Sequence, residues 1–303
     1  MKLGLLSAIL AEKSFRQTVD ICEQIGFEAL EVACWPKQAA QRRYAGVTHL
    51  DVNRLSPAQL EEELAYAANH HVQISALGYY PNPLSPVEEE RVTAQNHIRK
   101  LIQVAGYTGI GMVNTFIGRD RFRTVEENLD LYEEVWSPIV EEAEKANVRV
   151  AIENCPMIFS QDEWPGGNNL ASTPAIWDEM FRRIDSDHLG LNYDPSHCVI
   201  LDMDYIKPIY QYKEKLFHIH LKDTHIFQDK LDAQGRMAYP LSYMAPKLPG
   251  LGDIDWGAFC SALYDIRFDG CACVEVEDKT FEDNENSIRK GIELAYKNVS
   301  CFF

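Results

Sequence analysis

Short apolar runs alternate with longer segments of helical periodicity along the whole chain. The apolar runs predict eight strands, at residues 2–7, 29–34, 72–77, 112–117, 148–153, 189–194, 216–221 and 271–275. Between them, apolar positions spaced by three or four predict helices at 14–25, from 57, and over 85–105, 124–146, from 174 and over 284–298. Eight strand–helix units without a linker predict a single-domain (β/α)8 TIM barrel over residues 1–303. A doubly wound open sheet is less favoured, because no glycine-rich phosphate loop follows the first strand.

The strand predicted at 216–221 carries polar side chains in a phase that packing does not explain. His218, His220 and Lys222 alternate with apolar residues, so a strand places all three on one face. Imidazole and ammonium groups are rarely buried without partners. One alternative is a core histidine with satisfied hydrogen bonds plus a surface lysine. We favour the interpretation that this strand ends at a site and offers one histidine as a metal ligand.

Carboxylates end three other late strands. Glu153 ends the fifth, Asp194 the sixth and Glu275 the eighth, and His220 lies near the end of the seventh. Because barrel strands end at one rim, we expect these side chains to converge there rather than to spread outward. Converging carboxylates repel one another unless a cation lies between them. Oxygen ligands with one nitrogen favour Mn²⁺, Mg²⁺ or Co²⁺ over a structural zinc.

Two loops that follow predicted strands are long, at 154–172 and 223–254. In a barrel both lie at the carboxyl-terminal mouth, where barrel enzymes keep their active sites. Long loops in compact domains tend to be functional, so we expect both to border the site.

The composition is that of an acidic protein. Its 29 Lys and Arg against 46 Asp and Glu give a net charge of −17 at pH 7, which opposes binding to nucleic acid or to an anionic membrane surface. No apolar run is long enough to predict a membrane span, and we interpret the amino terminus as the first strand rather than a signal peptide. The eight cysteines contain no CxxC pair, which suits reduced thiols. We therefore expect a cytoplasmic protein with no nucleic-acid or membrane partner.

Five motifs carry a family resemblance: IEN at 152–154, DPSH at 194–197, HIHLKD at 218–223, PGLGDIDW at 249–256 and DGCACVEVED at 269–278. In these motifs the chain resembles the xylose-isomerase-like TIM barrels, which include tagatose and psicose 3-epimerases, inosose dehydratase, 3-keto-glycoside epimerases and lyases, and endonuclease IV. The resemblance covers nearly the whole chain. It implies one divalent metal per chain, Mn²⁺ before Mg²⁺, Co²⁺ or Zn²⁺, with four ligands: Glu153, Asp194, His220 and Glu275.

The resemblance implies a metal-dependent sugar isomerase or epimerase acting on a small keto-sugar. Proton abstraction next to the carbonyl would pass through an enediolate, with Glu153 and Glu275 as the catalytic pair. His197 would contact the substrate, or else only cap a helix. Lys222 would polarise a substrate oxygen or protonate a leaving group, or else form a plain salt bridge. Trp35 and Trp164 would stack on a sugar ring, or else pack in the core.

Two departures argue against a simple ketohexose 3-epimerase. Ile226 stands where those enzymes have an arginine, and Phe159 stands where they have a glutamate. Lys222 instead matches the HxKD branch that includes inosose dehydratase. A keto-sugar or 3-keto-glycoside dehydratase or lyase is therefore the alternative, and a non-catalytic sugar-binding barrel is an alternative of another class. The nuclease function is disfavoured because Tyr79 and Phe116 stand near positions where endonuclease IV has histidines. A homo-oligomer is left open.

Overall fold

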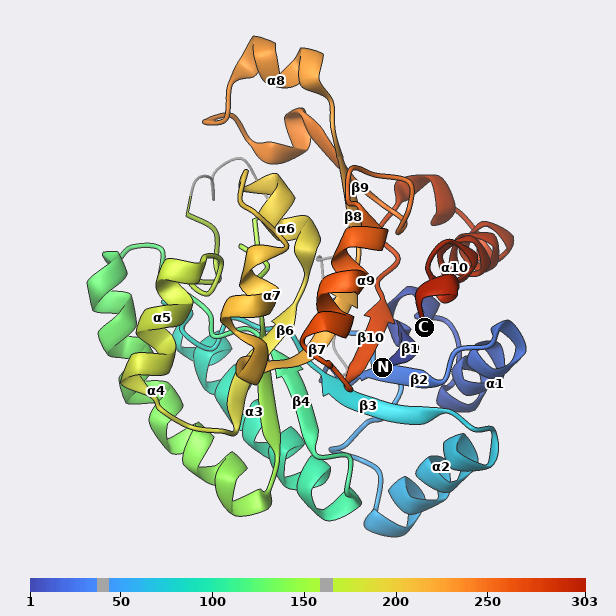
Figure 1. The fold of residues 1–303 in the computed structure, drawn as a ribbon. Coiled ribbons are helices and arrows are strands. Elements are labelled where there is room, and N and C mark those ends of the chain that lie inside the picture. The colour runs from blue at the N-terminus through green and yellow to red at the C-terminus, as the bar shows by residue number, and fades with distance from the viewer. Residues whose placement is uncertain (37–43, 159–165) are drawn as a thin grey trace.

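Eight parallel strands close into a barrel in the computed structural model, which describes residues 1–36, 44–158 and 166–303 (Figure 1). The order around the barrel is β1-β10-β7-β6-β5-β4-β3-β2. The strands are β1 (Lys2–Leu6), β2 (Ala29–Ala33), β3 (Gln73–Gly78), β4 (Met112–Thr115), β5 (Arg149–Glu153), β6 (Leu189–Tyr193), β7 (Leu216–Leu221) and β10 (Cys271–Val274). Each matches a predicted strand, and the closed parallel barrel confirms the predicted (β/α)8 TIM barrel fold.

Helices follow the strands and surround the barrel (Figure 1). They are α1 (Phe15–Ile25), α2 (Pro57–Asn69), α3 (Glu88–Thr108), α4 (Val125–Ala146), α5 (Pro174–Arg183), α6 (Pro195–Ile200), α7 (Lys207–Gln211), α8 (Gln228–Gln234), α9 (Trp256–Asp265) and α10 (Glu285–Val299). Helices α1, α2 and α4 begin at capping boxes, with Ser14, Ser56 and Thr124 as the N-caps. Helix α3 ends three residues later than predicted, where Gly109 adopts a left-handed conformation with φ of 75°.

Four neighbouring strands, β5, β6, β7 and β10, bring the predicted site residues to one rim. Their register pairs Glu153 with Asn192, Asn192 with His218, and Cys273 with His220. Strands β6 and β10 end one residue earlier than predicted, so Asp194 and Glu275 lie directly beyond them. Asp194 is the N-cap of α6, and its Oδ1 accepts a hydrogen bond of 2.8 Å from the backbone of Ser196. This cap fixes the Asp194 side chain at the rim.

The polar side chains of β7 are buried on one face, as the alternation predicts. His218 and His220 have exposed fractions of 1% and 0%, and Lys222, just beyond the strand, has one of 4%. The His218 ring is hydrogen-bonded through Nδ1 to Asn192 (2.9 Å) and through Nε2 to Ser75 (3.1 Å). Both ring nitrogens of His218 have hydrogen-bond partners inside the barrel, so we interpret the role of this histidine as structural.

An insertion after β7 was not predicted. Strands β8 (Asp223–Ile226) and β9 (Met244–Lys247) pair as an antiparallel hairpin, with α8 between them, and the hairpin projects above the barrel (Figure 1, top). Leu231, Tyr243 and Met244 form its small apolar core. Asp223 lies at the base of the hairpin. Its carboxylate accepts hydrogen bonds from the backbone of Gly250 and from the indole of Trp256 (3.0 and 2.9 Å), which links the hairpin to the residues that follow it. The predicted loop at 223–254 is therefore largely an ordered subdomain.

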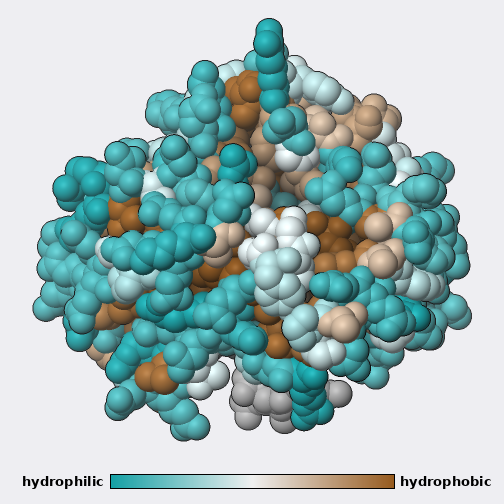
Figure 2. Space-filling model, turned by 90° about the horizontal axis from the view of Figure 1, so that it is seen from below, coloured by the Kyte–Doolittle hydropathy of each residue, from teal (hydrophilic) through white to brown (hydrophobic). Residues whose placement is uncertain are grey.

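Hydrophilic residues dominate the face opposite this insertion, as expected for an acidic chain (Figure 2). Within the described residues, no helix combines the length and the apolar character that crossing a membrane requires. All eight cysteines are free thiols, in agreement with the reduced state expected from their spacing.

Candidate functional site

Four side chains from neighbouring strands converge at the rim. Each of Glu153, Asp194, His220 and Glu275 offers one ligand atom, and these atoms all lie within 4.8 Å of one another. All four residues are buried. The structure thus brings together the four residues proposed as metal ligands.

The His220 ring has one nitrogen engaged and the other facing the cluster. Its Nε2 lies 2.8 Å from Oε2 of Glu31. Its Nδ1 lies 3.8 Å from Oε1 of Glu153 and 3.5 Å from Oε2 of Glu275, and it has no hydrogen-bond partner among the described residues. A proton on Nε2, donated to Glu31, leaves the Nδ1 lone pair free for a metal.

Glu31, on β2, was missed by the sequence analysis. This carboxylate is fully buried and also accepts hydrogen bonds from the amide of Asn114 (2.9 Å) and the hydroxyl of Tyr80. Burial opposes ionisation, but His220 and His218 hold the pKa of Glu31 below its ordinary value. The available signal was a lone acidic residue within the apolar run 29–33, because such a residue is rarely buried without a partner.

Lys222 lies among three carboxylates. Its Nζ is 2.8 Å from Oε2 of Glu275, 3.1 Å from Oδ2 of Asp194 and 3.4 Å from Oε2 of Glu277. Burial disfavours the ammonium, but Asp194, Glu275 and Glu277 outweigh it and raise the pKa of Lys222 well above the ordinary value. Lys222 is therefore a buried cation at neutral pH that touches two of the proposed ligands.

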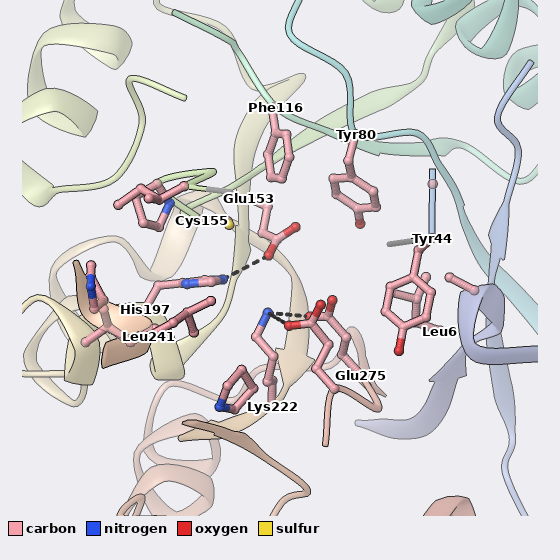
Figure 3. Close-up of a pocket in the computed structure, with 18 of the residues that line it drawn as sticks. Leu6, Tyr44, Tyr80, Phe116, Glu153, Cys155, His197, Lys222, Leu241 and Glu275 are labelled. Carbon is pink, nitrogen blue, oxygen red and sulfur yellow. Dashed lines mark hydrogen bonds and ion pairs between the residues drawn. The ribbon is translucent and has the colours of Figure 1, made fainter. Parts of the chain in front are cut away.

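His197, in α6, contacts the other side of the cluster. Its Nε2 is 3.3 Å from Oε1 of Glu153 (Figure 3) and 3.2 Å from Oδ2 of Asp194. Burial would raise the pKa of Glu153, but the hydrogen bond from His197 and the nearby His220 and Lys222 lower it to about 2. Glu153 is therefore ionised at neutral pH. The two glutamates have different nitrogen partners, His197 for Glu153 and Lys222 for Glu275.

A pocket of about 440 Å³ opens above the cluster and is lined by Glu153, Glu275, His197 and Lys222 (Figure 3). Trp35 also lines it, with its ring edge-on to Tyr79 at 4.8 Å between centroids. This position fits both a stacking role and core packing, the two alternatives that the sequence left open. Trp164, the other predicted stacking residue, lies outside the described residues.

The donor set fits a divalent cation. Two of its buried atoms, Oδ2 of Asp194 and Nδ1 of His220, have no hydrogen-bond partner among the described residues. Lys222 and His197 lie within ion-pair distance of that Asp194 oxygen, but neither is oriented to form a hydrogen bond with it. Buried polar atoms without partners are rare, and a cation coordinated by both atoms accounts for them. Carboxylate oxygens with one imidazole nitrogen suit Mn²⁺, Mg²⁺ or Co²⁺, and Zn²⁺ also accepts them.

Known proteins similar to this chain include inosose dehydratases and a D-psicose 3-epimerase. Inosose dehydratase of Clostridium tetani is 26% identical over 154 residues, which span 50% of this chain and only 50% of the length of that relative. Two solved structures share the fold over nearly the whole length. The IOLI protein with a bound zinc atom has a TM-score of 0.72 at 19% identity and covers 100% of this chain and 99% of its own. D-psicose 3-epimerase of Clostridium cellulolyticum, solved with D-tagatose, has a TM-score of 0.70 at 16% identity and the same coverage.

The family relationship rests on a family model that matches most of the chain. The model of the xylose isomerase-like TIM barrel family matches residues 19–298, a span that includes all four converging side chains. The chain therefore belongs to the xylose isomerase-like TIM barrel family.

Proposed function

We propose that this chain is a divalent-metal-dependent isomerase or epimerase of a keto-sugar, with Glu153, Asp194, His220 and Glu275 as the metal ligands. The observation that carries the proposal is the convergence of these four groups on one another, beside a pocket into which both glutamates point (Figure 3). Strands β6 and β7 separate β5 from β10 in the barrel. Glu153 and Glu275 therefore approach a bound substrate from different directions.

The chemistry is proton transfer at the carbon next to a carbonyl. A divalent cation in this site would polarise the carbonyl oxygen and so acidify the neighbouring C–H bond. Glu153, ionised because its pKa is about 2, is ready to accept a proton. Glu275 accepts a hydrogen bond of 2.8 Å from the ammonium of Lys222, which holds its carboxylate at the pocket. One glutamate removes the proton from one face of the carbon, and the other returns a proton to the opposite face.

Elimination is the second candidate reaction, and Lys222 favours it. A buried ammonium that borders the pocket can protonate a departing hydroxyl or glycosidic oxygen after Glu153 has removed the neighbouring proton. The similarity to inosose dehydratase agrees with a dehydratase or lyase. Epimerisation and elimination share their first step and differ only in the fate of the resulting carbanion.

The test is to supply the metal-loaded protein with a panel of keto-sugars in D₂O. An epimerase or isomerase incorporates deuterium beside the carbonyl and keeps all carbon and oxygen atoms, whereas a dehydratase or lyase accumulates an elimination product. A protein that binds one metal per chain and binds sugars, yet shows neither exchange nor elimination with any keto-sugar, is a sugar-binding barrel, and the proposal is wrong.

A further inference from the structure

The pocket has a charged end and an apolar end. Four of the charged groups that line it, Glu153, His197, Lys222 and Glu275, are buried at the rim of the barrel, and the less buried Glu277 and Lys279 line it as well. Much of the remaining described lining is apolar, contributed by Trp35, Phe116, Ile200, Leu241, Met244 and Pro246. In Figure 3, Phe116 lies on one side of the pocket, and Leu241 lies beside His197 on the other.

Part of the apolar end belongs to the insertion between β7 and β10. Tyr239, Pro240, Leu241, Met244 and Pro246 all line the pocket, and all of them lie in or beside the β8–β9 hairpin. Leu241 has an exposed fraction of 49%, although it borders a concave site. A ligand that covers Leu241 removes apolar surface from water, which is favourable.

A free monosaccharide matches only the charged end of this pocket. Sugar hydroxyls need hydrogen-bond partners when they are buried, and the apolar side chains of Leu241, Ile200 and Phe116 provide none. The volume of about 440 Å³ lies in the range of roughly 300–1,000 Å³ typical of pockets for drug-sized ligands. The pocket therefore has room and chemistry for an apolar group attached to the sugar.

A phosphate group does not suit the apolar end. The basic residues of the described lining are Lys222, His197 and Lys279. Lys222 is already paired with Asp194 and Glu275, and His197 with Glu153 and Asp194. Glu277 adds a negative charge to the same wall. An uncharged substituent is therefore favoured over an anionic one.

We propose that the substrate is a keto-glycoside whose aglycone is an uncharged, apolar ring, seated against the insertion that carries Leu241. This inference rests on the proposed function for the identity of the sugar end. The inference about the aglycone depends only on the residues that line the pocket, so binding measurements test it without turnover.

The experiment measures binding of matched methyl and phenyl glycosides of glucose, galactose and mannose to the metal-loaded protein by calorimetry. In at least one pair, the phenyl member should bind about 10–100-fold more tightly, because burial of an aromatic ring is worth roughly 1.5–3 kcal/mol. Leu241→Asp should reduce this phenyl-to-methyl ratio severalfold. Leu251→Asp is the matched control, since Leu251 is 41% exposed and is not part of the pocket lining, and it should leave the ratio unchanged.

The outcomes separate this inference from the proposed function. Equal affinity within every pair, or no binding of any phenyl glycoside, overturns the aglycone proposal, as does an equal effect of Leu241→Asp and Leu251→Asp. The 3-keto derivatives of the same pairs then report on turnover. Turnover without phenyl preference leaves the proposed function intact, whereas phenyl preference without turnover or deuterium exchange supports the aglycone site and contradicts the proposed chemistry.

Discussion

The Nε2 atom of His220 lies 2.8 Å from a carboxylate oxygen of Glu31, which is completely buried on the second strand of the barrel. This contact fixes the ring so that Nδ1 faces Glu153 and Glu275. It joins two residues that are 189 positions apart in the chain. Glu31 is therefore a positioning residue for the proposed metal ligand His220.

We expect Glu31→Gln to weaken metal binding by about 10–100-fold, the usual effect of removing a carboxylate that orients a ligand histidine. The glutamine keeps the shape of the side chain but loses the charge that makes the His220 ring a better ligand. Metal competition with a chromophoric chelator measures the affinity. Glu28→Gln is the control, because Glu28 is an exposed acid just before β2. Equal affinity of wild type and Glu31→Gln would show that Glu31 has no such role.

Removal of the metal should lower stability as well as activity. A ligand that binds only the folded state stabilises it by about 4 kcal/mol at a free concentration 1,000 times its dissociation constant. Thermal unfolding with and without chelator should therefore differ by several degrees, and Mn²⁺ should restore both the melting temperature and activity. A chelated protein that keeps its melting temperature and its full activity would contradict the metal site.

Replacement of the two histidines of β7 should separate metal binding from stability. His220→Ala removes the nitrogen that faces Glu153 and Glu275, so metal affinity should be lost. His218→Ala leaves the partners Asn192 and Ser75 unsatisfied, which should cost roughly 1–3 kcal/mol of unfolding free energy. Metal content and urea unfolding of the metal-free proteins measure the two effects. If His218→Ala lost metal affinity and His220→Ala lost only stability, His218 rather than His220 would bind the metal.

The alternation of polar residues in 216–222 and the acids at strand ends sufficed to predict the cluster, because barrel geometry brings strand ends to one rim. Glu31 was not predicted, since its partner His220 is distant in the chain and a single acid in an apolar strand does not reveal its contacts. The β8–β9 hairpin was missed because its short strands carry no clear alternation. The apolar end of the pocket could not be foreseen, since it depends on where that hairpin folds.

Lys222→Met should raise metal affinity and abolish elimination. The ammonium lies 3.1 Å from Asp194 and 2.8 Å from Glu275, so it repels a cation bound by the same carboxylates. Its removal should tighten metal binding by at least ~10-fold. The metal-free variant should lose roughly 3–5 kcal/mol of stability, because its carboxylates are left buried without their cation. Calorimetric titration with Mn²⁺ measures the affinity, and weaker binding would show that Lys222 supports the site.

The same variant distinguishes the two candidate reactions. If the enzyme is an epimerase, Lys222→Met should retain measurable deuterium exchange beside the carbonyl, because Glu153 still accepts the proton. If it is a dehydratase or lyase, exchange should persist while the elimination product disappears. Loss of exchange together with product would instead make Lys222 the base.

The most direct test of the account is deuterium exchange by Glu153→Gln and Glu275→Gln in D₂O. Each glutamine keeps an oxygen that can bind the metal but removes the proton-accepting carboxylate, so metal content should fall only partly. Turnover should fall by about 10²–10⁴-fold, the usual contribution of general acid–base catalysis. The variant that lacks the base facing the substrate proton should show no exchange, and the other should exchange slowly. Wild-type exchange rates in both metal-loaded variants would contradict the assignment of Glu153 and Glu275 as the proton-transfer pair.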